Sequence, residues 1–599
     1  MFLCKIDVFI IQLSILATGD KLKNRLSGIL IVLILSSCTR FPFSMTTSVG
    51  EPSLQIHDIQ GCNHTSAHIG KKVTEIQGIV TWKDDQGFYI QDIVPDNEDC
   101  SSEALYVFTN QYSEVIPGDL VSVSGEVNEF VPNSSQADQL TITEIKSSSV
   151  NILSGGNSLP DPVIIGLNGR IPPDKIIEDD AFSTFDPNSD GIDFYESLEG
   201  MRVEIDNAIV VSPEDEYKEI YVIPGDMTSK NLISMQGALI ASSQDDNPER
   251  IMVALPLGNQ KVINVGTRFT QPIVGILSYA YGNYEIIETN TLSIQQNRVS
   301  VLKLSSSDGV NTLRVATYNT DNLNRFDTVR INELASQIVH VLGMPDLLVL
   351  EEIQDDSGEE NDGTISAVKT LQLIVDKIIE LGGHNYSYID NPPQNNSSGG
   401  VGGGNIRTVM LYRIDRGLKL DLNQSEISTI GLSVFGNSRI PVVRLFTFHN
   451  QPVYLIGVHL VSNNANSPLF GSIQPILKPD DDKRLSQATW IENLVSSLQA
   501  NKQDATILLV GDFNDTPDSK PLEVLQKAGF NDLAQFIPES ERYSILFQGN
   551  AYLYDQILFK QSSSIFAVSD VNVIHINTYL NANQQNSDHD PFVVDLVVK

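Results

Sequence analysis

The feature that most constrains this 599-residue chain is a change of pattern near Thr312. Before it, short runs of apolar residues are separated by Pro, Gly, Asn and Asp, which is typical of β-strands joined by turns. After it, strand-like apolar runs alternate with amphipathic helical patterns. We therefore expect a β-rich N-terminal part followed by a layered α/β domain over residues 311–599. The predicted strands of that domain are residues 313–319, 347–352, 408–412, 442–448, 453–459, 506–511, 556–559 and 592–598, and the predicted helices are residues 328–342, 366–381, 483–498 and 521–527.

Two β-rich blocks precede this domain, at residues 54–155 and 185–297. The second block echoes the first at an offset of 130 positions: Gly70-x-x-Val73 and Gly78-Ile79-Val80 correspond to Gly200-x-x-Val203 and Ala208-Ile209-Val210. A looser echo relates Gly118 and Gly125-x-Val127 to Gly266 and Gly275-x-Leu277. Repeats at a fixed spacing indicate a duplicated unit. The size and strand count of each block fit an OB-like barrel.

Residues 1–53 have the pattern of a targeting segment and tether. A basic stretch at residues 21–25 is followed by an apolar run at 26–35 and then by Ser36-Ser37-Cys38, which is the order found in secretory signal peptides. It resembles the bacterial lipoprotein type, in which Cys38 is lipidated and anchors the protein to a membrane. The apolar residues 1–20 ahead of it leave two explanations, a start site near Lys21 or an N-terminal membrane hairpin. In both cases we expect an exported protein, either a cell-envelope lipoprotein or an extracellular one.

The cysteine positions and the net charge limit the classes of protein to which this chain can belong. Cys62 and Cys100 fall in one block of an exported protein, so they form either a disulfide or two buried thiols. The net charge of −36 argues against a protein that coats nucleic acid through Lys and Arg. The negative charge is compatible with an enzyme that binds phosphate through metal ions. Its simplest explanation is that it keeps the protein soluble. No sequence feature indicates a protein partner.

Six short polar motifs mark the ends of the predicted α/β strands. Taken singly, each has an ordinary structural explanation, such as a turn, a solvated strand end or a core histidine. Together they place carboxylates, amides, imidazoles and a guanidinium in loops held by a rigid sheet, where catalytic residues usually lie. The motifs are Val315-Ala-Thr-Tyr-Asn319, Glu351-Glu352, Ser438-Arg439, Gly457-Val-His459, Gly511-Asp512-Phe-Asn514-Asp515, and Tyr554-Asp555 with Ser587-Asp588-His589-Asp590.

The order of these motifs resembles the endonuclease/exonuclease/phosphatase superfamily over nearly all of residues 311–599. The run from Ser467 to Pro475, followed by Arg484 and Gln487-Ala488, resembles the secreted bacterial nuclease branch. In that branch OB-like domains precede the catalytic domain, and the phrase from Phe194 to Met201 (FYESLEGM) is associated with the same arrangement. The resemblance implies a four-layer α/β sandwich, with two β-sheets flanked by helices, preceded by two β-rich OB-like barrels.

The resemblance also implies roles for individual residues. The metal ion, Mg²⁺ or else Ca²⁺ or Mn²⁺, would be bound by Asn319, Glu352 and Asp588, which offer the oxygen ligands that such hard cations prefer. The catalytic set would be His459, Asp512, Asn514, Asp555 and His589, with Asp512 acting on the water and Asp555 orienting His589. Arg439 would contact the substrate phosphate. Two positions depart from the family: Glu351 replaces the usual Gln, which we expect only to make the site more acidic, and Gln556 stands where many relatives have His or Arg.

Three hypotheses of function follow. The leading one is an exported nuclease that hydrolyses DNA, or RNA, by in-line attack of water on phosphate. The second is a phosphatase or phospholipase C-like enzyme of the same superfamily, although no strongly apolar hairpin lies near the motifs. The third is a non-catalytic surface binding protein, against which the complete motif set argues.

Overall fold

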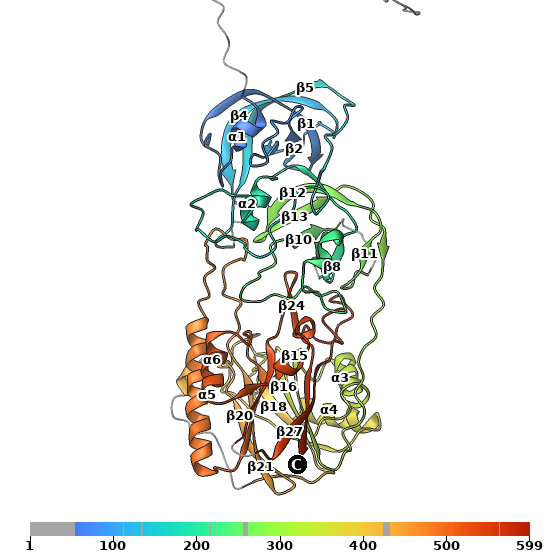
Figure 1. Ribbon diagram of the computed structural model, residues 1–599, viewed down its shortest axis with the longest axis vertical. Coiled ribbons are helices and arrows are strands. Elements are labelled where there is room, and N and C mark those ends of the chain that lie inside the picture. Colours follow the sequence, from blue (N-terminus) through green and yellow to red (C-terminus); the bar gives the residue numbers. More distant parts are fainter. Residues whose placement is uncertain are drawn as a thin grey trace, which may run out of the picture. The chain divides into compact units, whose positions relative to one another are not determined.

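The computed structural model describes residues 54–111, 113–132, 136–215, 217–255, 262–422, 432–561 and 564–599 (Figure 1). The predicted signal peptide, Cys38 and the tether lie outside these described residues. Among the described helices, none has the length and apolar character needed to cross a membrane.

The first β-rich block is a closed barrel with the strand order β1-β2-β3-β5-β4. Its interior is filled by fully buried side chains that include Val80, Ile90 and Val123. Cys62 and Cys100 are joined by a disulfide, which excludes the alternative of two free thiols. The elements of the block are α1 (Ile56–Gln60), β1 (Lys72–Lys83), β2 (Gly87–Gln91), β3 (Ala104–Phe108), β4 (Leu120–Phe130) and β5 (Ile142–Ser154).

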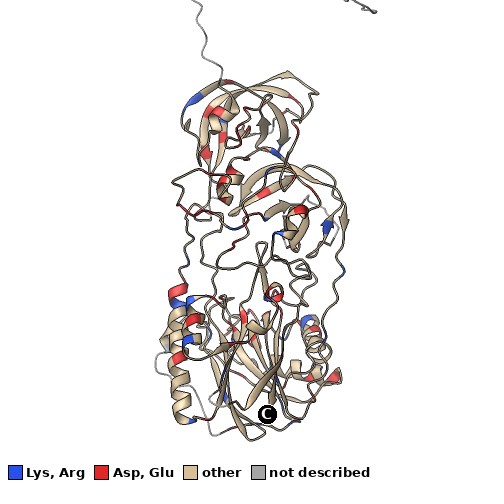
Figure 2. Cartoon of the chain, in the orientation of Figure 1, with Lys and Arg blue, Asp and Glu red and all other residues tan. Residues whose placement is uncertain are grey.

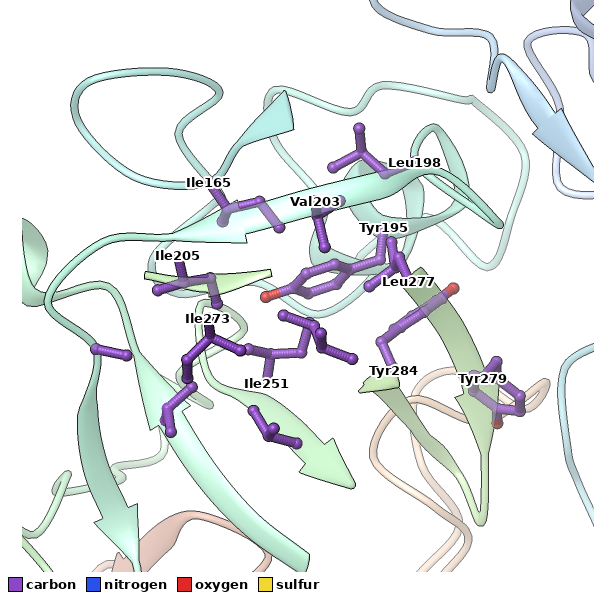
Figure 3. Packing of buried hydrophobic residues seen from close by; sticks show 14 of the residues in the cluster. Ile165, Tyr195, Leu198, Val203, Ile205, Ile251, Ile273, Leu277, Tyr279 and Tyr284 are labelled. Carbon is purple, nitrogen blue, oxygen red and sulfur yellow. The ribbon is translucent and has the colours of Figure 1, made fainter. Parts of the chain in front are cut away.

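The second β-rich block is a nine-stranded sheet with the order β14-β11-β8-β9-β10-β13-β12-β7-β6. Its core gathers Tyr195 of helix α2 with branched residues such as Val203, Ile251 and Leu277 (Figure 3). The elements are β6 (Val163–Ile164), α2 (Gly191–Glu196), β7 (Arg202–Ile205), β8 (Ile209–Ser212), β9 (Glu219–Ile223), η1 (Gly225–Ser229), β10 (Ile251–Ala254), β11 (Arg268–Phe269), β12 (Ile273–Ala280), β13 (Asn283–Glu288) and β14 (Ile294–Gln295).

The repeat predicted from the sequence has a structural basis in matching backbone hydrogen bonds. Gly70 N donates to Val127 O and Gly200 N donates to Leu277 O, both at 2.8 Å. Gly118 N donates to Val80 O at 2.9 Å, and Gly266 N donates to Val210 O at 2.8 Å. The four glycines all have positive φ, between 74° and 91°, which glycine adopts without strain.

The two blocks also share a strand-pairing scheme. In the first, β3 runs parallel to β5 and the pairs β1–β2, β2–β3, β4–β5 and β1–β4 are antiparallel. In the second, β10 runs parallel to β13 and the pairs β8–β9, β9–β10, β12–β13 and β7–β12 are antiparallel. The expectation of a second closed barrel needs correction, because the counterpart of β1 is broken into β7 and β8. The break contains Asn207, whose φ is 50°, and the result is an open nine-stranded sheet.

The C-terminal region contains two six-stranded sheets, ordered β17-β18-β16-β15-β28-β27 and β19-β20-β21-β22-β26-β23. We call this region the sandwich. Its strands are β15 (Thr312–Leu323), β16 (Leu347–Ile353), β17 (Tyr386–Ile389), β18 (Arg407–Arg413), β19 (Leu418–Leu420), β20 (Val442–Phe448), β21 (Gln451–His459), β22 (Thr506–Asp512), β23 (Asn531–Asp532), β26 (Asp555–Lys560), β27 (Phe566–Val573) and β28 (Phe592–Val598). Its helices are α3 (Thr328–His340), α4 (Val368–Glu380), α5 (Asp481–Asn501) and α6 (Lys520–Lys527). Short elements η2 (Leu432–Phe435), η3 (Leu533–Phe536), η4 (Glu539–Glu541), β24 (Ile545–Phe547) and β25 (Asn550–Tyr552) complete it.

Three hydrophobic clusters define four layers in the sandwich. One cluster lies between the sheets and includes Val349 and Leu508. Another joins the first sheet to α3 and α4, and a third joins the second sheet to α5 and α6. Figure 1 shows these helix pairs on opposite sides of the sheets. The four layers and the eight main strands agree with the sequence prediction. Strand β27 was not predicted, because its apolar residues are interrupted by Ser569 and Asp570 at a shift of register and the strand is half-exposed.

Candidate active site

The six motifs meet where strands of both sheets end. In the second sheet, His459 lies opposite Asp512 across the parallel pair β21–β22, and Asp512 lies opposite Asp555 across β22–β26. These three side chains therefore occupy one row across neighbouring strands. In the first sheet, Asn319 lies opposite Glu351 across the parallel pair β15–β16, which places Glu352 one residue further on.

Asn319 connects the two sheets. Its Nδ2 donates to Glu352 Oε1 at 3.3 Å and to Asp512 Oδ2 at 3.0 Å. Its backbone carbonyl accepts a hydrogen bond of 2.7 Å from Ser587 Oγ, next to Asp588. The predicted metal ligands and the predicted catalytic Asp512 are thus held in one hydrogen-bonded group.

Glu352 has the properties expected of a metal ligand. Its backbone adopts φ = 59°, an unusual value that turns the side chain out of the strand ladder. Burial, and then the negative charge of Asp588, raise the pKa of Glu352 to about 7. A divalent cation between these two carboxylates would relieve their repulsion. The donors offered by Asn319, Glu352 and Asp588 are all oxygens, so the residues present fit Mg²⁺, Mn²⁺ or Ca²⁺.

His589 and Asp555 form a buried pair in which His589 Nδ1 lies 2.5 Å from Asp555 Oδ2. Burial acts to lower the pKa of His589, but the carboxylates of Asp555, Asp588 and Asp512 together hold it well above its ordinary value. His589 therefore carries a proton at neutral pH, and its Nε2 remains to face a substrate.

The pKa of His459 is shifted in the opposite direction from that of His589. His459 is 2% exposed, and burial followed by the positive charges of Arg439 and His589 lowers its pKa well below the ordinary value. Its Nε2 lies 3.4 Å from Asp512 Oδ2. The site therefore contains one charged and one neutral imidazole.

Asp512 is fixed by the turn that follows β22. Asn514, with φ = 51°, donates from its backbone N to Asp512 Oδ1 at 2.7 Å and from Nδ2 to Oδ2 at 3.3 Å. Burial raises the pKa of Asp512 to about 6. Arg439 donates from Nη2 to Leu460 O at 2.5 Å, while its buried Nε has no hydrogen-bond partner. All nine predicted metal, catalytic and phosphate-contacting residues thus come from strand ends or adjoining loops of the sandwich.

The two departures from the family have different surroundings. Glu351 is fully buried, and its Oε1 accepts a hydrogen bond of 2.7 Å from Thr317 Oγ1. Burial, and then the charge of Asp555, raise the pKa of Glu351 well above its ordinary value. A carboxyl group that keeps its proton resembles the amide of the usual Gln, and the more acidic site expected from the sequence stays a prediction. Gln556 is also buried, and its Nε2 donates to Asp515 O at 2.9 Å.

Two residues that hold His589 in place were not predicted from the sequence. Asn577 donates from Nδ2 to His589 O at 2.6 Å and to Tyr318 Oη at 2.7 Å. Ser544 accepts the Asp555 backbone N–H on its Oγ at 3.0 Å, and its carbonyl accepts the Asp590 N–H at 2.8 Å. Neither residue belongs to a patterned run, so no sequence signal could have identified it.

Two grooves are lined by residues that lie near the motifs in the chain. One, of about 460 Å³, is lined by residues that include Asn463, Tyr554 and Arg250. The other, of about 670 Å³, shares Asn463 and Tyr554 and extends to Lys478 and Lys520. None of the nine predicted site residues lines either groove.

Comparison with known proteins assigns families to two parts of the chain. Residues 316–582 match the endonuclease/exonuclease/phosphatase family, and residues 164–297 match a domain of unknown function, DUF8508. No curated protein matches the chain.

Similar solved structures cover about half of the chain. A humanised D. rerio TDP2 is 17% identical, covers 48% of this chain and 99% of its own, and has a TM-score of 0.33. The D. rerio TDP2 complexed with a single-strand DNA product is 19% identical, with 48% and 98% covered and a TM-score of 0.34. An endonuclease/exonuclease/phosphatase from Bacteroides vulgatus is 14% identical, with 48% and 99% covered and a TM-score of 0.32. Residues 316–582, which make up most of the sandwich, thus match the endonuclease/exonuclease/phosphatase family, whose members are generally metal-dependent phosphoric ester hydrolases.

Proposed function

We propose that the protein is an exported, metal-dependent phosphodiesterase that hydrolyses nucleic acid, with DNA as the first substrate to test. The observation that carries the proposal is the convergence of Asn319, Glu352 and Asp512 with the His589–Asp555 pair at the ends of two facing sheets. This set contains oxygen ligands for a cation, a carboxylate beside a water position and a protonated imidazole, which are the groups that phosphodiester hydrolysis requires.

Each residue has a role consistent with its environment. Glu352, Asn319 and Asp588 would hold the cation, which when bound neutralises phosphate charge and stabilises the leaving oxygen. Asp512, held by Asn514, would orient the attacking water. His589, protonated through Asp555, would donate from Nε2 to a phosphate oxygen, and Arg439 would contact the same phosphate through its unpartnered Nε.

We propose that the first β-block is an OB-type barrel and that the second is an opened relative of it, whose first strand is interrupted. The identical pairing scheme and the matching glycine bonds support this. In Figure 2, Lys and Arg of these blocks are scattered among Asp and Glu, so we assign them a supporting role beside the sandwich and not the main contact with a polyanion.

Export and lipidation remain part of the proposal. The disulfide between Cys62 and Cys100 supports them, because such bonds persist in oxidising compartments. Labelling cells with a radioactive fatty acid tests the anchor: wild-type protein should be labelled and Cys38→Ser should not. Label in the variant would refute Cys38 as the lipidated residue.

Activity is tested with purified protein on plasmid DNA, RNA and sphingomyelin, each with a chelator or with added Mg²⁺, Mn²⁺ or Ca²⁺. We expect DNA cleavage that the chelator abolishes, and loss of cleavage in Glu352→Ala and His589→Ala. Hydrolysis of sphingomyelin alone would support the phospholipase hypothesis. A lack of activity on every substrate would support the binding-protein hypothesis, and activity retained in either variant would refute the role of that residue.

A further inference from the structure

A second group of acidic residues lies far from the motifs of the sandwich, in the loop that leads into α2. The sequence Asp186-Pro-Asn-Ser-Asp190-Gly-Ile-Asp193 has the D-x-N-x-D-G spacing of cation-binding loops. In the structure, one carboxylate oxygen from each of Asp186, Asp190 and Asp193 lies within 4.8 Å of the others. Asp193 also belongs to an overlapping group of the same size with Glu178 and His64.

Two carboxylates in this group are buried without a partner for one oxygen. Asp190 is 1% exposed, and its Oδ1 accepts no hydrogen bond. Glu178 is 8% exposed, and its Oε2 also accepts none. Unpaired buried carboxylates are costly, so such groups normally bind a cation or another donor.

The remaining oxygens are held in place by donors. His64 Nε2 lies 2.7 Å from Asp193 Oδ1, and the Asp186 backbone N donates to Asp193 Oδ2 at 2.6 Å. Glu178 Oε1 accepts from the backbone N of Asp180 at 2.8 Å and of Phe182 at 3.2 Å. Partners of this kind hold the carboxylate ligands of a metal site in a fixed orientation.

We propose that Asp186, Asp190 and Asp193 bind one Ca²⁺ ion, with Glu178 beside Asp193 at the edge of the site. Carboxylate oxygens contributed by a loop suit Ca²⁺, which accepts six to eight oxygen ligands in variable geometry. Zinc is disfavoured, since the group contains no Cys and its one imidazole nitrogen, His64 Nε2, is engaged with Asp193.

The position of the site indicates what the ion does. His64 comes from the segment that leads into the barrel, whereas Asp190 and Asp193 belong to the start of α2. Two residues further along α2, Tyr195 lies against Tyr284 in the core of the second block (Figure 3) and contacts Phe470 of the sandwich at 6.0 Å between ring centroids. The ion would therefore stabilise the junction of the three regions.

The test uses the full chain carrying Glu352→Ala, so that the proposed catalytic metal site does not contribute and nuclease activity is not the readout. Calorimetry with CaCl₂ should find one site, with a Kd of about 10⁻⁵ to 10⁻³ M. CaCl₂ should also raise the midpoint of thermal unfolding. Asp190→Asn should weaken binding at least about tenfold. Asp179→Asn, which removes a neighbouring charge but no ligand, should weaken it less than about threefold.

Asp186→Asn provides an independent ligand change if Asp190→Asn does not fold. The absence of Ca²⁺ binding in the Glu352→Ala protein would overturn the proposal. Equal losses in Asp179→Asn and the ligand variants would also overturn it, since that result means a diffuse attraction to acidic residues. Because none of these measurements depends on catalysis, the proposal and the proposed nuclease activity can fail separately.

Discussion

The His589–Asp555 pair shows how strongly the site depends on single residues. His589→Ala should lower kcat about 10²- to 10⁴-fold, the usual contribution of a positioned acid or base. Asp555→Asn removes the charge that helps to hold the pKa of His589 above its ordinary value. Activity that needs protonated His589 should therefore decline at a lower pH in Asp555→Asn than in wild type.

The pH dependence of kcat on an oligonucleotide substrate measures this effect. His340→Ala, an exposed histidine at the end of α3, is the matched control and should leave the profile unchanged. An Asp555→Asn profile that is lower but not displaced would contradict the pairing argument.

The burial of Glu249 leads to a prediction about how the free energy of unfolding depends on pH. It is fully buried, neither carboxylate oxygen has a hydrogen-bond partner, and burial followed by Asp245 raises its pKa to about 8. A raised pKa means that the folded protein prefers the protonated acid. The contribution of Glu249 to the free energy of unfolding is therefore complete below the unfolded pKa near 4.5, and it is lost as the pH rises through about 8.

Glu249→Gln should raise the free energy of unfolding by up to a few kcal/mol at pH 8 to 9, and change it little near pH 4.5. Urea unfolding at both pH values measures this change in the free energy of unfolding. Glu359→Gln, at an exposed glutamate, should have no effect at either pH. An equal effect of Glu249→Gln at both pH values would show that packing, and not ionisation, is responsible.

At the scale of elements, the pairing of β21 with β22 aligns His459 with Asp512. Gly511 makes this possible: its φ is 146°, and an added Cβ would lie 1.9 Å from Val458 O. Gly511→Ala should therefore lower the free energy of unfolding by more than about 2 kcal/mol, because the pairing of the two strands must shift. Activity of the folded fraction should fall as well, since Asp512 is displaced.

The control is Gly417→Ala, in the same region, where an added Cβ meets nothing within 4 Å. Its unfolding midpoint should stay close to that of wild type. If both alanine variants unfolded at the same denaturant concentration, the steric argument for Gly511 would be wrong.

At the scale of the whole molecule, the 462–480 loop joins the sandwich to the second block. Phe470 is 1% exposed and packs against Tyr195 and Tyr284, while Tyr279 Oη donates to its carbonyl at 2.7 Å. Phe470→Ala should lower the free energy of unfolding by about 3–5 kcal/mol, the usual cost of removing a buried aromatic ring. Phe536→Ala, at a ring that is 58% exposed, should cost less than about 0.5 kcal/mol. Similar losses in the two variants would mean that Phe470 is not part of the core.

Much of this molecule was predictable from local patterns. Short apolar runs located the eight main strands, because a strand that is buried on both faces, such as β22, is apolar almost throughout. The glycines of the repeat were informative since each needs a positive φ at an equivalent hydrogen bond, as Gly70 and Gly200 show. The motif order located the site residues, because polar groups at strand ends meet at one edge of a sheet.

Other features depend on contacts that no local pattern records. The proximity of Asn319 to Asp512, the support of His589 by Asn577 and the pKa values of Glu351 and Glu249 arise from burial and from neighbours distant in sequence. The interruption between β7 and β8 was likewise not visible, since Asn207 in its turn resembles any other loop residue. Short-range periodicity and residue type were thus enough to predict the main elements and the candidate site residues. The contacts between charged groups, the burial of individual carboxyls and the junction of the sandwich with its β-blocks followed only from the folded structure, because they depend on packing between distant segments.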